Sequence, residues 1–264
     1  MHLSESLIHA SKAFASVVSE DSRIGPMLKS MNQLYTGRDY SSSGMVNNEL
    51  TSQNVDEISK QSMPLCMRQM HDGLKRNHKL KHWGRLQYGL FLKGAGMTME
   101  ESLIFFQREF GKIMTGEQFQ KEYAYNIRHM YGKEGKRASY TPYNCQKIIM
   151  GSTPQNEDHH GCPFKDYDEG NLSSLLSKMQ INEREKDEIL DLKRKKNYQI
   201  ACQKHFLAMH PGVNAMPEIQ LEGVGNHPNA WYQASRAYHG QKSQVATSEI
   251  QDERKPVSVT PLKP

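Results

Sequence analysis

Four isolated cysteines constrain this chain more than any other feature of its 264 residues. They are Cys66, Cys145, Cys162 and Cys202. Gaps of 78, 16 and 39 residues separate them and no CxxC pair occurs, which counts against a zinc ribbon or finger, whose ligands usually come in close pairs. Four thiolates from distant segments suit an iron–sulfur cluster. Spacing alone leaves open four unrelated core cysteines, or a zinc site that includes His159 or His160.

The local sequence around the cysteines favours a metal site over four packing residues. Cys66 and Cys145 follow a proline by two and three residues, so we expect both in first helical turns, where the helix dipole lowers a thiol pKa. Cys162 lies in a tight His-Gly-Cys-Pro turn, and a Cys-Pro step is familiar at cluster ligands. Cys202 is expected inside a helix over 198–209, where its own neighbours offer no special chemistry.

Apolar residues recur at helical spacing along most of the chain, whereas alternating strand patterns are scarce. We therefore predict a mainly α fold with few short strands. Thr98 with Glu101 and Thr115 with Gln118 have the spacing of capping boxes at helix starts, and the last strong helical segment is expected at 198–209. The expected divisions are a helical segment at 1–35, a linker at 36–54, one domain at 55–238 and a disordered tail at 239–264.

The charge of the chain is unevenly distributed. Its formal net charge is +5, but residues 64–147 hold 15 Lys or Arg and 7 Asp or Glu, a net of +8. A basic region of this kind suits a polyanion-binding surface, although a solvated basic surface would give the same count. No apolar run is long enough to span a membrane, we expect no signal peptide, and no phosphate-loop or catalytic motif is present.

Two segments of the basic region interleave aromatic and basic residues. Residues 75–88 (KRNHKLKHWGRLQY) and 123–137 (YAYNIRHMYGKEGKR) both have this pattern. Stacking together with backbone neutralisation is how proteins bind single strands and helix ends. A single tyrosine in such a segment is more often part of the core, but two such segments together favour nucleic-acid binding.

Long stretches of the chain resemble the C-terminal domain of the large subunit of eukaryotic DNA primase. The resemblance begins in CMRQMHDGLKRNHKLKHWGRLQYGLFLKGAGMTMEESLIFF and continues in FQKEYAYNIRHMYGKEGKRASYTPYNCQKII. It then passes through HHGCPF, YQIACQKHF and NHPN at 226–229, and covers about residues 20–238. The resemblance implies a helical domain that binds a 4Fe–4S cluster through Cys66, Cys145, Cys162 and Cys202.

The resemblance also implies a nuclear, non-catalytic subunit that helps to start RNA primers in DNA replication. Such a domain grips the DNA template with the 5′ end of the RNA primer, including its triphosphate, while the small subunit performs nucleotidyl transfer. DNA polymerase alpha is the further implied partner. The implied nucleic-acid contacts are Lys81, His82, Arg85, Gln87, Tyr88, Tyr123, Tyr125 and Asn126.

The chain departs from the family pattern in two ways. Lys81 stands where members often have Arg, and Trp83 where they often have Gly; lysine keeps the charge but loses a bidentate fork. Members also have a long N-terminal domain that docks the small subunit, and only residues 1–35 resemble its end, so we expect an N-terminally shortened form. The alternatives to a primase role are a zinc-stabilised DNA- or RNA-binding module and a redox enzyme that uses the cluster.

Overall fold

The computed structural model describes residue 40 and residues 50–252, with side chains as far as residue 241. Contacts divide the chain into two compact units, residues 1–38 and 39–264, and every described residue belongs to the second. The helix expected within 1–35, most of the expected linker and residues 253–264 of the expected tail therefore lie outside the described residues. The division of the chain into domains stays a prediction.

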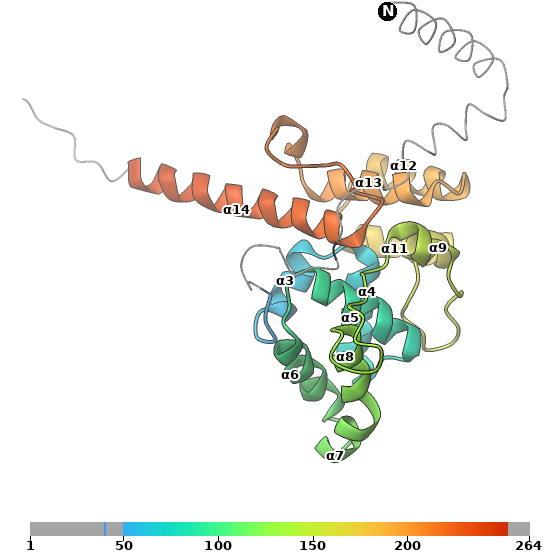
Figure 1. Ribbon diagram of the computed structural model, residues 1–264. Helices are drawn as coiled ribbons and strands as arrows, with labels where there is room; N and C mark the ends of the chain where they lie inside the picture. The colour runs from blue at the N-terminus through green and yellow to red at the C-terminus, as the bar shows by residue number, and fades with distance from the viewer. Residues whose placement is uncertain (1–39, 41–49, 253–264) are drawn as a thin grey trace, which may run out of the picture. The chain divides into compact units, whose positions relative to one another are not determined.

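The described residues are helical and contain no strand (Figure 1). The mainly α fold is thus confirmed, and the expected few short strands are wrong for this part of the chain. The helices of its first half are α3 (Val55–Ser62), α4 (Leu65–Asn77), α5 (His82–Gly94), α6 (Met99–Phe110), α7 (Gly116–Phe119), α8 (Tyr125–Met130) and α9 (Cys145–Met150).

Two of the expected helix starts differ in how their caps are completed. At α7, Thr115 accepts a hydrogen bond from the Gln118 amide and the Gln118 side chain accepts one from the Thr115 amide, so the capping box is confirmed. At α6, Thr98 accepts from the Glu101 amide at 3.2 Å. The Glu101 carboxylate does not return to Thr98 but accepts from the Ser52 amide at 2.6 Å. Only one of the two hydrogen bonds of this capping box therefore forms, because the Glu101 side chain binds the segment before α3 instead.

Between α7 and α8 the chain makes a π-helical turn, Gln120–Ala124. One residue more than an α-helical turn is accommodated there, so side chains on either side of it change direction relative to a regular helix. π-turns within helices are rare and are frequent at functional sites. This one carries Tyr123, a predicted contact residue.

The second half continues with α10 (Pro163–Asp166), α11 (Glu169–Lys178), α12 (Glu183–Arg194), α13 (Tyr198–Met209) and α14 (Pro228–Asp252). The helix expected at 198–209 is α13, which packs along α12. It is followed by α14, a helix that the sequence patterns did not predict, which begins at a proline in the favourable first position. The domain boundary expected at residue 238 falls within α14.

The core consists of two clusters of buried apolar side chains. The larger gathers side chains from α3 to α13 together with Tyr232 of α14, and the smaller lies between α13 and α14 around Phe206, Trp231 and Tyr238. Cys202 packs against both clusters, so α13 joins them. Within the described residues, no helix combines the length and apolar character that crossing a membrane requires.

Candidate functional site

The four cysteines, far apart in sequence, line one cavity. Each comes from a different helix or helix start, and none forms a disulfide. The rest of the wall is mostly apolar and consists of Ile148, Ile149, Pro163, Phe164, Tyr198, Gln199 and Gly225. The alternative ligands His159 and His160 are not in this wall. Cysteines that serve only as packing residues have no reason to line the same cavity. The convergence of all four therefore favours a metal site over four unrelated core cysteines.

The positions of the cysteines on their helices agree with those expected from the sequence, with one shift. Cys66 is the second residue of α4. Cys145 is the first residue of α9, which begins at an Asn144 cap rather than at Pro142. Cys162 is the N-cap of α10 and Cys202 lies inside α13. Three of the four thiols therefore lie at helix starts, where backbone N–H groups favour negative charge.

Burial controls the protonation of these thiols. It raises the pKa of Cys162 to about 11 and raises the pKa of the other three cysteines further above the ordinary thiol range. The neighbouring cysteines raise the pKa of Cys66, Cys145 and Cys202 as a second cause, because thiolates around one cavity repel one another. Four thiolates can coexist there only with positive charge between them.

The donor set fits a four-thiolate group in kind. Four free thiols from four segments face one apolar cavity, and Cys₄ ligation is what a 4Fe–4S cluster uses. The fit is one of donor chemistry alone, because among the described residues no group of three or more His, Cys, Asp or Glu side chains is arranged to hold a metal ion.

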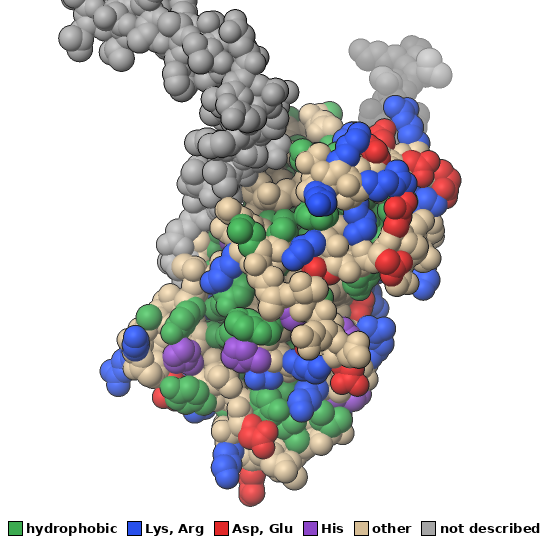
Figure 2. All heavy atoms as spheres, turned by 90° about the vertical axis from the view of Figure 1, so that its right-hand side faces the viewer, with side chains coloured by type: hydrophobic (Ala, Val, Ile, Leu, Met, Phe, Trp, Pro, Cys, Tyr) green, Lys and Arg blue, Asp and Glu red, His purple; other side chains and the backbone are tan. Residues whose placement is uncertain are grey.

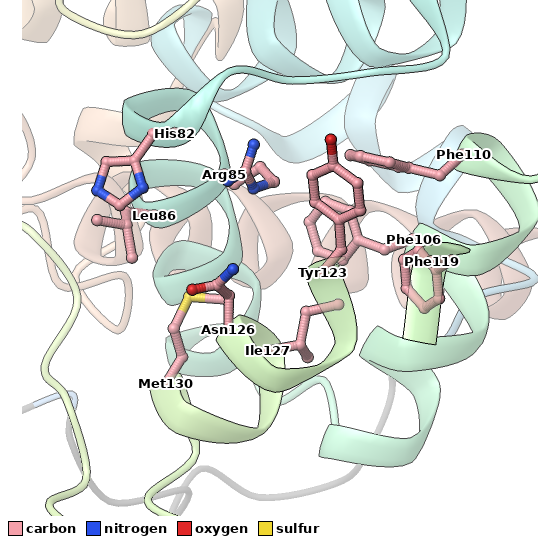
Figure 3. A pocket seen from close by; sticks show the side chains of 10 residues that line it. All are labelled: His82, Arg85, Leu86, Phe106, Phe110, Phe119, Tyr123, Asn126, Ile127 and Met130. Atoms are coloured by element: carbon pink, nitrogen blue, oxygen red, sulfur yellow. The ribbon is translucent and has the colours of Figure 1, made fainter. Parts of the chain in front are cut away.

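A second pocket brings together residues of the two predicted nucleic-acid segments. Its lining includes His82 and Arg85 from α5, Tyr123 from the π-turn and Asn126 from α8. Figure 3 shows Arg85 between His82 and Tyr123, with Asn126 beneath it. The floor is apolar and consists of Leu86, Phe106, Phe110, Phe119, Ile127 and Met130. The pocket itself is small, about 10 Å³, and its exposed lining is apolar, so a ligand would bind on the surface beside it rather than inside it.

Arg85 is fixed within this pocket. Its Nη1 donates to the Leu80 carbonyl at 2.8 Å, and its guanidinium carbon lies 4.8 Å from the centroid of the Tyr123 ring. Burial lowers the pKa of Arg85, but a guanidinium stays charged at neutral pH. Its Nε is buried and has no hydrogen-bond partner among the described residues. A partly desolvated cation is suited to an anionic ligand.

Gln87 and Tyr88 are in the interior, contrary to the expectation that they contact nucleic acid. Tyr88 is fully buried and its hydroxyl bonds to His71 Nδ1 at 2.8 Å. Gln87 is buried and its carboxamide bonds to the backbone of Gly161. On α5 these residues follow Arg85 by two and three positions, so helical geometry turns them to other faces. We do not retain either of them as a contact residue.

Lys81, Trp83 and Tyr125 are exposed, as a contact surface requires. Lys81 Nζ donates to the Asn156 carbonyl at 2.6 Å, so this cation is partly engaged within the protein. Trp83, the departure from the family pattern, is 49% exposed and packs edge-on against His82. The indole therefore stands beside the second pocket as a free stacking face and is not among the residues that line it.

Two rings that were not predicted as contacts extend the exposed aromatic surface. His129 stacks on Tyr125 with 5.8 Å between ring centroids, and Tyr140 lies 4.8 Å from His129. His129 lies within the second basic segment, but Tyr140 is beyond its end, and only the folding back of the loop after α8 brings it near. Figure 2 shows His, basic and hydrophobic side chains intermixed on one face, low on the molecule where α5–α8 lie in Figure 1.

Comparison with known proteins gives consistent matches. The family model for the C-terminal domain of the eukaryotic and archaeal DNA primase large subunit matches residues 56–232. The chain is 42% identical over 245 residues to the DNA primase large subunit of Homo sapiens, covering 91% of this chain and 46% of that protein. It is 40% identical to a probable DNA primase large subunit of Arabidopsis thaliana, covering 93% and 52%. The Saccharomyces cerevisiae large subunit is 38% identical, with coverage of 83% and 43%. The chain spans about half the length of these relatives.

Proposed function

Because the chain belongs to the family of C-terminal domains of eukaryotic and archaeal DNA primase large subunits, we propose that it binds a primer–template junction and carries a 4Fe–4S cluster. Family membership implies a role in primer synthesis during DNA replication. The observation that carries the more specific proposal is the convergence of His82, Arg85, Tyr123 and Asn126 on one pocket.

The residues that would hold the cluster are the four cysteines of the first cavity. When bound, the cluster supplies the positive charge that four buried thiolates need and ties together segments that are distant in sequence. The protein contributes three helix starts, which favour thiolates, and an apolar wall that limits solvent access. We infer a structural role first, in which these contacts hold α4, α9, α10 and α13 together.

We propose that the surface beside the second pocket, rather than its small interior, receives the phosphorylated 5′ end of an RNA primer paired with DNA. The N-terminus of α5 has no acidic residue in its first turn and no side-chain cap, so the helix start favours an anion near Arg85. Arg85 supplies a fixed charge, Asn126 a nearby carboxamide, and the exposed rings of Trp83 and Tyr125 supply stacking faces. A surface that binds phosphates at an α-helix start and stacks bases on adjacent aromatic rings suits the end of a nucleic-acid duplex better than its middle.

The partners follow from the same proposal. We propose that the chain acts in the nucleus without a catalytic centre of its own, and that nucleotidyl transfer belongs to the primase small subunit. DNA polymerase alpha would be the next enzyme to receive the primer. These assignments rest on the relatives, half of whose length this chain spans.

Binding to a labelled RNA–DNA duplex with a 5′-triphosphate on the RNA tests the proposal. Arg85→Ala should weaken affinity about 10- to 100-fold, since a hydrogen-bonded charge contact is lost. Tyr125→Ala, which removes an exposed ring, should weaken it by a smaller factor. Lys178→Ala, an exposed lysine at the end of α11, is the matched control and should leave affinity unchanged. If Arg85→Ala and Tyr125→Ala both bound as tightly as the unmodified chain, the assigned surface would be wrong.

A further inference from the structure

We propose that Gln87 is a positioning residue for Cys162, and that its side chain fixes the turn which presents this thiol to the cysteine cavity. The inference rests on the proposed function, since it assumes that the cavity binds a cluster. The resemblance implies that Gln87 contacts nucleic acid, but Gln87 is buried. The proposal gives this residue a different role.

The carboxamide of Gln87 makes a reciprocal pair with one backbone residue of the turn. Its Oε1 accepts from the Gly161 amide at 2.9 Å, and its Nε2 donates to the Gly161 carbonyl at 3.1 Å. Both bonds are buried, and the side chain is 4% exposed. Two bonds to the N–H and C=O of a single residue fix the orientation of both adjoining peptides. The carbonyl held by Gln87 is the one that precedes Cys162.

The turn itself has little freedom to replace this support. Gly161 has φ +90°, a conformation that residues with a Cβ rarely adopt, and a Cβ there would collide with the Asp166 carboxylate. That carboxylate accepts from the Cys162 amide at 2.8 Å. Gln87 therefore holds the residue before the thiol while Asp166 holds the thiol-bearing residue. Loss of the Gln87 side chain would leave the buried N–H and C=O groups of Gly161 without these partners, which is energetically unfavourable. The turn could restore hydrogen bonds to these groups only by moving.

A second glutamine supports the same segment from the helix that begins near Cys66. Gln69 Nε2 donates to the His159 carbonyl at 2.9 Å, and Gln69 lies one helical turn after Cys66 on α4. The two amides thus anchor residues 159–161 to α4 and α5 together. Hydrogen-bonded partners behind metal ligands commonly affect retention of the metal by about 10- to 100-fold. Gln87 has the stronger case because it contacts the residue next to the ligand with both of its polar atoms.

Cluster retention tests the inference in the purified, cluster-loaded chain. Gln87→Met keeps the length and packing of the side chain but removes both hydrogen bonds. We expect iron release to a chelator to be about 10- to 100-fold faster, and amide hydrogen exchange to rise in the peptide that spans 159–162. Gln107→Met, at an exposed glutamine of α6, is the control and should change neither. Gln87→Glu keeps an acceptor for the Gly161 amide but sets a carboxylate against its carbonyl, so iron release should again be faster than from the unmodified chain.

The outcomes separate this inference from the proposed function. If the unmodified chain binds no iron, the proposed function fails and the inference fails with it. If the unmodified chain holds iron and Gln87→Met releases it at the same rate with unchanged exchange at 159–162, only the positioning role of Gln87 is overturned. Should Gln87→Met fail to fold, Gln87→Glu decides: unchanged iron release would contradict the inference, and faster release with local exchange at 159–162 would support it.

Discussion

The guanidinium of Arg85 lies over the ring of Tyr123, with 4.8 Å between its central carbon and the ring centroid. This contact joins α5 to the π-turn before α8, and so joins two segments that are separated by almost forty residues. The ring and the Leu80 carbonyl hold the guanidinium in one orientation. A cation held in advance loses less conformational entropy on binding than a flexible surface lysine.

Replacing the guanidinium of Arg85 by another cation should show how much its fixed orientation contributes to binding affinity. Arg85→Lys retains a cation but loses the planar stacking on Tyr123 and the bidentate geometry. We expect affinity for the 5′-triphosphate duplex to fall about 3- to 10-fold, less than for Arg85→Ala, with a similar salt dependence because the charge count is unchanged. Arg184→Lys, at an exposed arginine of α12, is the control. Equal binding by Arg85→Lys and the unmodified chain would mean that charge alone matters.

Glu109 is a buried carboxylate surrounded by cations. Lys75 and Lys112 each lie 2.8 Å from it, Arg108 lies 3.5 Å away, and its side chain is 1% exposed. Burial alone would raise the pKa of Glu109, but hydrogen bonds from Lys112 and Lys75 outweigh it and lower the pKa to about 2. The carboxylate therefore ties α4 to α6 at neutral pH.

Glu109→Gln should lower the free energy of unfolding by about 2–4 kcal/mol at pH 7, because it removes the charge while the cations remain. The folded-state pKa lies below the unfolded one, so this contribution is present above about pH 4.5 and is lost as pH falls toward 2. Urea unfolding at pH 7 and pH 3 measures both effects, and the difference between variant and unmodified chain should shrink at pH 3. Glu117→Gln, at an exposed glutamate of α7, is the control. A constant difference at both pH values would contradict the assignment.

His205 is buried with both ring nitrogens lacking a hydrogen-bond partner among the described residues. Burial lowers its pKa to about 3, so the folded protein keeps the ring neutral while the unfolded chain takes up a proton below about pH 6.5. Stability should therefore fall as pH drops from 6.5 toward 3, by at most about 1.4 kcal/mol per pH unit from this group. His205→Phe should remove that part of the pH dependence without destabilising the protein at pH 7. His210→Phe is the contrast: it loses bonds to Phe206 and Ser235 and should destabilise at pH 7. Identical pH profiles for His205→Phe and the unmodified chain would refute this assignment.

Local sequence patterns predicted the helices better than they predicted the side-chain environments. The capping box at Thr115 and the helix that contains Cys202 followed from spacing and composition, which act within a few residues. The α14 helix was missed because its alternating polar and aromatic residues lack a clear apolar face until they pack against Phe206. The Glu101 carboxylate accepts a hydrogen bond from the Ser52 amide instead of from its expected capping partner. This contact joins segments that are distant in sequence, so no local pattern could predict it.

The candidate sites show the same division. That four cysteines separated by up to 78 residues line one cavity is a tertiary fact, which spacing could only suggest. Arg85 and Gln87 looked equivalent in sequence, both polar and both within a basic segment. The two-residue offset on a helix sends one to the pocket and the other to the turn at Gly161. Which side of α5 would be covered depended on the loop before Cys162, and that loop has no helical or strand pattern to predict its path.

Metal and acid-labile sulfide analysis of the chain purified without oxygen tests the central claim most directly. We predict about four iron atoms and about four sulfides per chain, with visible absorption that disappears on exposure to a chelator. Cys202→Ser should lower the iron content, whereas Ala208→Ser, on the same helix but outside the cavity wall, should not. Stoichiometric zinc without iron, or full iron in Cys202→Ser, would contradict a cluster held by these four cysteines.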